Sequence, residues 1–143
     1  MDSTMKRIIF IFLNCTWGIG ATLVGLFFFI KHRKCTHRIY HGVIETCWEK
    51  PYSGLSLGLF IFTPNVNPEH TLKVRVHEYG HSVQNIVLGP LMLVVAVISV
   101  TWANHPHFVK KRKEQHIPYT ACFVESWASR WGEAVTKEEA IWN

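Results

Sequence analysis

Two long uncharged segments constrain this chain of 143 residues more than any other feature. Residues 8–30 and residues 82–104 each run for 23 positions without an Asp, Glu, Lys or Arg. A helix rises about 1.5 Å per residue, so either segment is longer than the roughly 30 Å hydrocarbon core of a bilayer. The apolar residues are therefore distributed as in an integral membrane protein and not as in a soluble core. We expect one mainly α-helical, membrane-embedded domain over residues 1–143.

The first uncharged segment predicts an N-terminal transmembrane helix over residues 8–30. Its apolar part is longer than the h-region of a cleavable signal peptide, so we expect it to be retained. Residues 31–55 are polar and basic and contain Pro51 and Gly54, which predicts a juxtamembrane loop. Residues 56–62 are apolar but too short to cross a membrane, and they predict a short apolar strand or a re-entrant segment.

A second long helix is expected to begin just after Pro68 and to occupy residues 69–88. A kink is predicted at Gly89-Pro90, because proline has no N–H to donate and clashes with the preceding turn. The apolar residues 91–104 then continue as a second membrane segment.

The C-terminal part of the chain predicts a loop and one more helix. Residues 105–116 are charged and loop-like in composition. Pro118 is expected to open the last helix, because proline is tolerated in a first turn. This helix is predicted over residues 118–132 and ends around Gly132.

Basic residues cluster after both uncharged segments and contribute to a net charge of +5. Such flanks are typical of the cytoplasmic side of a cell membrane and of contact with anionic lipids, so we expect a lipid bilayer as partner and no nucleic acid. If both basic clusters lie on the cytoplasmic side, the second uncharged segment cannot make a single crossing of the membrane. Either this segment enters the membrane and returns at Gly89-Pro90, or the residues from Ile117 onward cross the membrane again. The clusters are Lys31, Arg33, Lys34 and Arg38, and Lys110, Lys111, Arg112 and Lys113.

The pattern H-E-x-x-H occurs at residues 77–81, directly before the second uncharged segment. On a helix, His77 and His81 are four residues apart and project from one face, so both imidazoles can reach a single metal ion. Glu78 is then placed as a general base that takes a proton from a metal-activated water. The ligand types favour zinc without dictating it. We expect this site near the cytoplasmic interface of the membrane.

A catalytic zinc site generally needs a third protein ligand, and Glu125 is the best candidate. It lies in an otherwise apolar stretch, where an unpaired carboxylate would be expensive. Ala128 and Ser129 fall on the same helical face as Glu125. Their small side chains would allow this helix to pack closely against the helix that carries the two histidines.

These residues resemble the gluzincin metallopeptidases, in which H-E-x-x-H is followed downstream by a helical E-x-x-A-D. This chain has Glu125-Ser126-Trp127-Ala128-Ser129 at the second motif. The resemblance implies His77, His81 and Glu125 as zinc ligands and Glu78 as the general base. Ser129 stands where the family has an aspartate that orients a ligand histidine, which implies a weaker, uncharged partner for that histidine.

A closer resemblance covers most of the chain. Trp17-Gly18, residues 56–62, residues 77–91 and residues 125–128 are similar to a group of small uncharacterised bacterial membrane proteins with an H-E-Y-G-H core. This resemblance implies the architecture more than the activity. Site-2 proteases also carry H-E-x-x-H in a membrane helix, but they take a later aspartate as third ligand, and the one aspartate here is Asp2.

The sequence therefore predicts a membrane-bound zinc metallopeptidase that hydrolyses peptide bonds of membrane-proximal peptides or proteins. Residues 56–62 are a candidate edge for binding substrate as an added strand, with a buried packing strand as the alternative. Tyr79, His116 and Tyr119 are candidates for stabilising the oxyanion. Two other functions stay open: a zinc-binding but non-catalytic partner, assembly or immunity factor, and a structural membrane protein without metal.

Overall fold

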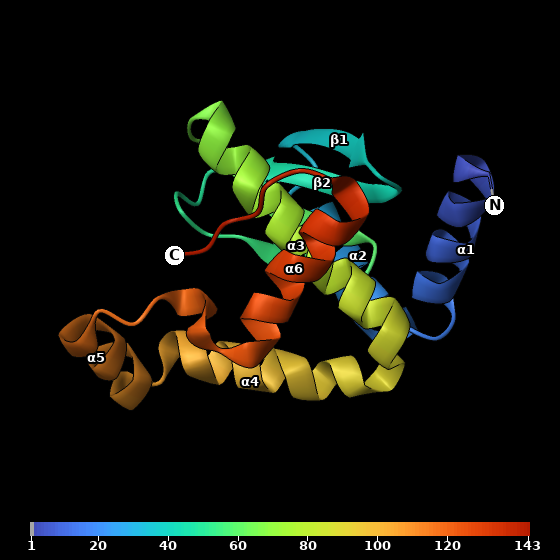
Figure 1. Cartoon of the computed structure of the whole chain (residues 1–143). Helices are drawn as coiled ribbons and strands as arrows, with labels where there is room; N and C mark the ends of the chain where they lie inside the picture. Colours follow the sequence, from blue (N-terminus) through green and yellow to red (C-terminus); the bar gives the residue numbers. More distant parts are fainter. Residues whose placement is uncertain (1) are drawn as a thin grey trace.

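The computed structural model describes residues 2–143 as a mainly helical protein with one small sheet (Figure 1). α3 and α6 cross at the centre of the molecule, with the sheet on one side of α3 and α4 beneath α6 in this view. The elements in chain order are α1 (Ser3–Cys15), α2 (Ile19–Lys31), β1 (Thr36–Tyr40), β2 (Val43–Trp48), β3 (Leu55–Leu57), β4 (Phe60–Pro64), α3 (Pro68–Leu88), η1 (Gly89–Leu91), α4 (Met92–Asn104), α5 (Pro106–Gln115), η2 (Tyr119–Ala121) and α6 (Phe123–Thr136).

The expected single helix over residues 8–30 is wrong, because α1 and α2 meet at an angle of 91°. The bend is held by a buried polar contact with α3. The Asn85 amide donates to Asn14 Oδ1 at 2.7 Å and to the Gly18 carbonyl at 3.2 Å. A Cβ at Gly18 would overlap the Asn85 side chain, so only glycine admits this contact. Each helix has 13 residues, about 20 Å, and is too short to cross a bilayer alone.

The loop expected over residues 31–55 is also wrong, because it contains the antiparallel pair β1–β2. The sheet has the order β1-β2-β4-β3, with β2 and β4 parallel and β3 and β4 antiparallel. The apolar residues 56–62 do not form one strand. Gly58, at φ +65°, turns the chain between β3 and β4 and packs against Thr22. As a result β4 is internal, whereas β3 lies at an edge of the sheet.

The hydrophobic core lies between the sheet, α3 and the N-terminal helices. Its buried members are Phe10, Val43, Trp48, Leu59, Phe60, Ile61, Phe62 and Tyr79. One carboxylate, Glu45, is buried at the edge of this core. It accepts hydrogen bonds from Arg75 Nε at 2.9 Å and Thr63 Oγ1 at 2.6 Å, which compensate the cost of removing its charge from water. These contacts join β2 and β4 to α3.

α3 occupies the segment where a helix was expected at residues 69–88. Its start has a clear local cause: the Asn67 side chain accepts a hydrogen bond from the His70 N–H, and Pro68 stands in the first turn. It ends at Leu88, and the next residue, Gly89, has φ +53° and lies against the Trp17 indole. The 3-10 turn η1 begins at Gly89 and contains Pro90, and α4 turns away from the axis of α3 at this point (Figure 1).

Two boundaries in the C-terminal half differ from expectation. The predicted loop 105–116 is the helix α5, whose first turn is capped by His105 and contains Pro106. The last helix begins at Phe123 and not at Pro118, because Pro118 and Cys122 have extended backbone on either side of η2. It also continues past 132 to Thr136.

One helical run is long and apolar enough to cross a membrane, namely Pro68–Asn104, which comprises α3, η1 and α4. The large apolar side chains of α4 that face outward include Leu93 and Val97, which are 63% and 66% exposed. α4 alone has 13 residues, or about 20 Å. α1 and α2 are long and apolar enough to cross a membrane only if the two helices, with the bend between them, are counted as one span.

Candidate metal centre

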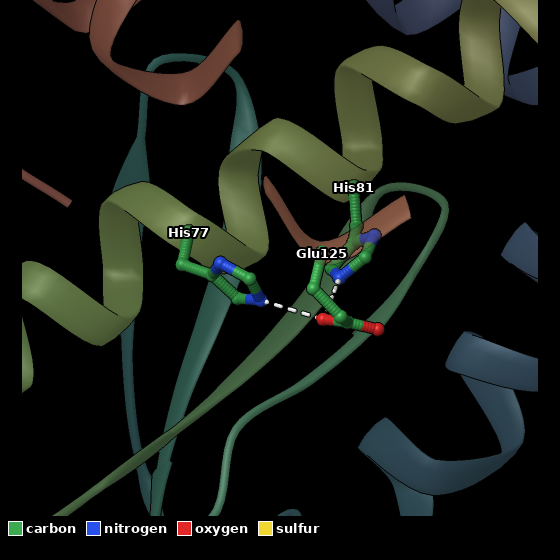
Figure 2. Close-up of side chains that lie close together, drawn as sticks. All are labelled: His77, His81 and Glu125. Atoms are coloured by element: carbon green, nitrogen blue, oxygen red, sulfur yellow. Dashed lines mark hydrogen bonds and ion pairs between the residues drawn. The ribbon is translucent and has the colours of Figure 1, made fainter. Parts of the chain in front are cut away.

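His77, His81 and Glu125 converge (Figure 2) where α3 and α6 cross (Figure 1). Glu125 Oε2 lies 3.1 Å from His77 Nε2 and 3.2 Å from His81 Nε2. All three residues are buried, and one ligand atom from each lies within 4.8 Å of the others. The three residues that the sequence indicated as ligands are therefore brought together. Within residues 2–143 this is the one group of His, Cys, Asp and Glu with such geometry.

Small residues allow the two helices to come this close. A Cβ at Gly80 would overlap the backbone carbonyl of Ala128, and a Cβ at Gly132 would overlap that of Val76. Ala128 and Ser129 are themselves fully buried. The expectation that small side chains at 128 and 129 permit close packing is thus confirmed. It also explains why Gly132 lies inside α6, since it serves this contact and does not end the helix.

The second ring nitrogen of each histidine has its own partner. His77 Nδ1 lies 2.8 Å from Ser129 Oγ, at the position where the gluzincin pattern has an aspartate that orients a ligand histidine. His81 Nδ1 lies 2.7 Å from Gln84 Oε1. The Gln84 amide nitrogen donates to the Val124 carbonyl at 2.9 Å, so its oxygen is the atom that faces His81. An acceptor there means that His81 Nδ1 carries a proton, and Nε2 is the ring nitrogen that faces Glu125.

The donor set fits a cation. The imidazole nitrogens and the Glu125 carboxylate present electron pairs to one another, which is unfavourable unless protons or a metal ion lie between them. Tetrahedral sites with ligand bonds near 2.0–2.1 Å place neighbouring ligand atoms about 3.3 Å apart, close to the 3.1 and 3.2 Å between Glu125 Oε2 and the Nε2 atoms of His77 and His81. Glu125 Oε1 is buried and has no hydrogen-bond partner within residues 2–143. Sequence and structure together define a possible metal-binding triad of His77, His81 and Glu125.

The electrostatic environment keeps the third ligand ionised. Burial alone would raise the pKa of Glu125, but hydrogen bonds with His77 and His81 outweigh it and hold that pKa well below its usual range. Burial raises the pKa of Tyr119, and the negative charge of Glu125 raises it further. Tyr119 therefore stays protonated and keeps an O–H that can donate to a ligand.

A cavity of about 790 Å³ opens beside the triad. One wall is formed by residues 52–57, which include the edge strand β3, and another by residues of α4 and η2. Glu78 lines this cavity, and a Cβ at Gly54 would overlap its carboxylate. Among residues 2–143, no Lys, Arg or Asp contributes to the lining. The space next to the metal-binding triad thus has mostly uncharged walls.

The three candidates for oxyanion stabilisation lie in different parts of the structure, and one of them lines the cavity. Tyr119 lines the cavity, and its hydroxyl lies 3.3 Å from Ser99 Oγ. Tyr79 instead points into the core, where its ring stacks on Phe10 at 5.5 Å. His116 ends α5 and is not among the residues that line the cavity. Spacing along the sequence could not have separated these residues, because the choice depends on how η2 and α4 pack.

Two supporting residues were given no role in the site by sequence reasoning. Gln84 has a detectable signal, since it follows His81 by three residues and so shares its helical face. Gly54 has no such signal, because its role depends on the loop before β3 lying against Glu78. Motif spacing identifies the ligands, but it does not identify the groups that hold them.

The chain matches no protein-family model, no curated protein and no solved structure. The assignment of a function therefore rests on the geometry of the site and on the motifs that form it.

Proposed function

We propose that the protein is a membrane-bound zinc metallopeptidase of gluzincin type, which hydrolyses peptide bonds of membrane-proximal substrates. The observation that carries this proposal is the convergence of His77, His81 and Glu125 beside a cavity that Glu78 also lines. Three protein ligands and an adjacent carboxylate are the minimum set for hydrolysis by a zinc-activated water. The E-x-x-A motif supplies the third ligand at the position expected for gluzincins.

Zinc is the ion that this donor set suits best. Two imidazole nitrogens and one carboxylate oxygen match the ligands of catalytic zinc, whereas magnesium and calcium prefer oxygen alone. When bound, zinc supplies Lewis-acid polarisation of a carbonyl and a lowered pKa for water. The buried second partners, Ser129 and Gln84, support the assignment, because metal-ligating histidines usually donate their other N–H in this way.

The chain's own groups account for the movement of protons. Glu78 accepts the proton of the attacking water and returns it to the leaving amine, which is the role of a general base and then a general acid. Tyr119 lines the cavity with a neutral hydroxyl, which can donate to the carbonyl oxygen as negative charge develops there. Each role uses a side chain that lines the same cavity.

The edge strand β3 offers a surface for the substrate backbone. An extended peptide can pair with a free strand edge through main-chain hydrogen bonds. β3 lines the cavity beside Glu78, and β4 is excluded from this role by its internal position. The uncharged walls contributed by α4, including Val95 and Ala96, favour small apolar side chains in the substrate.

The exposed apolar face of α4 supports a location in the cell membrane. Leu93 and Val97 on this face lie on the element that also forms one wall of the cavity. The basic side chains of α5 follow directly, in keeping with a cytoplasmic interface. A re-entrant α4 that follows the turn at η1 would bring the cavity to the membrane boundary.

The test is a comparison of wild type with Glu78→Gln in detergent. We expect both proteins to bind one zinc per chain, because Glu78 is not a ligand. Cleavage of a mixed peptide library, followed by mass spectrometry of new termini, should fall by about 10²-fold or more in the variant. Equal cleavage by both proteins would contradict the proposed role of Glu78 and point to a contaminating protease.

A second candidate is a zinc-binding membrane protein without catalysis, such as a partner, assembly or immunity factor. Ser129 in place of the gluzincin aspartate favours it, because a neutral partner makes the histidine less basic than a carboxylate does. This candidate predicts that Glu78→Gln leaves the biological role intact, whereas His77→Ala abolishes it. The peptidase proposal requires that both substitutions abolish it.

A further inference from the structure

The hydroxyl of Ser129 is shared between the metal-binding triad and the C-terminal segment. Ser129 Oγ donates its one proton to the carbonyl oxygen of Ile141 at 2.8 Å, since a carbonyl can only accept. The same oxygen lies 2.8 Å from His77 Nδ1. With its proton committed, Ser129 can only accept from His77. His77 must therefore carry a proton on Nδ1, and Nε2, the atom that faces Glu125, is the nitrogen that a metal ion can take.

The Ile141 carbonyl is held in place by several contacts along residues 140–142. The Ile141 N–H donates to the Lys73 carbonyl on α3 at 3.2 Å. Glu133 Oε1 accepts from the Ala140 N–H at 3.0 Å and from the Trp142 indole at 2.7 Å. Ala140 is buried. Figure 1 shows this segment returning from the end of α6 across α3.

We propose that residues 140–142 are a positioning element of the metal centre. The Ile141 carbonyl acts through Ser129 to keep His77 in the Nδ1–H tautomer, so that Nε2 is available to the metal ion. The inference rests on the proposed function, because it assigns these residues a role toward bound zinc. It also accounts for serine at the gluzincin aspartate position: a carboxylate at 129 would bring a second acceptor against the Ile141 carbonyl, whereas a hydroxyl satisfies both neighbours.

The experiment measures zinc affinity by chelator competition for the full-length protein and four variants. Ser129→Ala removes the shared hydroxyl, and we expect zinc binding to weaken by about 10- to 100-fold. Glu133→Ala removes the acceptor of two hydrogen bonds from residues 140–142, and we expect about a tenfold loss by the same route. Glu133→Gln keeps an acceptor oxygen and should restore the affinity to that of wild type. Arg130→Ala, exposed on the same helix, is the control and should leave it unchanged.

A second measurement reads the tautomer directly and requires no bound metal. ¹⁵N chemical shifts of labelled histidines in the metal-free wild type should show His77 protonated at Nδ1, with the signal assigned by its loss in His77→Gln. Ser129→Ala removes the acceptor of this proton, so the Nδ1 signal should move toward that of an unprotonated ring nitrogen.

The outcomes separate the inference from the proposed function. Wild type that binds zinc while Ser129→Ala and Glu133→Ala bind it equally well would overturn the inference alone. A metal-free wild type in which His77 carries a proton at Nε2 but none at Nδ1 would also overturn it, whether or not the variants fold. Wild type that takes up no zinc would overturn the proposed function, and the inference with it.

Discussion

At the residue scale, the candidate centre is built from ligands whose orientation is determined by neutral neighbours. Ser129 and Gln84 accept from the Nδ1 atoms of His77 and His81, and each of these partners is held in turn by a backbone carbonyl. Both imidazoles therefore present Nε2 to Glu125. Neutral acceptors raise the basicity of a ligand histidine less than a carboxylate does, so the arrangement relies on precise positioning.

Gly54 is predicted to control the position of Glu78. A Cβ at residue 54 would overlap the carboxylate of Glu78, the flexible end of that side chain, and would also come within 2.8 Å of Val74 Cγ1. We expect Gly54→Ala to lower the cleavage rate by about 10²-fold, because a displacement near 1 Å suffices for such a loss. Zinc stoichiometry should stay at the wild-type value. Steady-state cleavage and elemental analysis of one preparation measure both quantities.

Gly20→Ala is the matched control for that experiment. No atom lies within 4 Å of a Cβ built at Gly20, so the same substitution introduces no overlap there. Its cleavage rate should equal that of wild type. A Gly54→Ala protein as active as this control would show that the contact does not position Glu78.

At the scale of elements, the site depends on the close crossing of α3 and α6. The crossing brings Glu125, in the first turn of α6, to the helix that carries the two histidines. Gly80 meets the backbone of Ala128 at this point, and backbone cannot move aside as a flexible side chain can. The geometry of the triad is therefore coupled to the separation of the two helix axes.

Gly80→Ala is predicted to separate the two helices. Alanine in a helix is intrinsically favoured over glycine by about 1 kcal/mol, so an exposed site would be stabilised by this change. Here the overlap with the Ala128 carbonyl should dominate and lower the free energy of unfolding by about 1–3 kcal/mol, the usual cost of overpacking. Zinc affinity should fall as well. Thermal unfolding in detergent would contradict this account if Gly80→Ala were as stable as wild type.

Some elements could be predicted from the sequence because their causes are local. The start of α3 follows from Asn67 and Pro68, and its metal-binding face follows from the four-residue spacing of the histidines. Glu125 was detectable as a carboxylate in an apolar stretch. The bend between α1 and α2 was not, because it depends on Asn85, which lies far away in the sequence.

The β1–β2 pair was missed for a similar reason. The segment that forms this pair is polar and basic in composition. β2 also pairs with β4, and because β3 lies between these two strands along the chain, their pairing is a tertiary contact. The C-terminal residues 140–142 were missed because their contacts with Ser129 and Lys73 leave no periodic pattern in the sequence.

At the scale of the whole molecule, the cavity lies between two kinds of wall. β3 and the loop before it belong to a compact sheet with a buried core, whereas α4 turns an apolar face outward. The proposed peptidase would thus bind an extended chain at a sheet edge while its opposite wall contacts the membrane. Basic residues on α5 and after α2 are the expected neighbours of anionic lipid.

The central claim is a metal centre with three protein ligands, and zinc content is its most direct test. Elemental analysis of the detergent-purified protein, wild type beside Glu125→Ala, should give close to one zinc per chain in wild type and much less in the variant. Glu78→Gln is the control, since it changes a neighbouring carboxylate that is not a ligand, and it should retain the zinc. Wild type without metal after zinc has been supplied would contradict the account and leave a structural membrane protein as the better description.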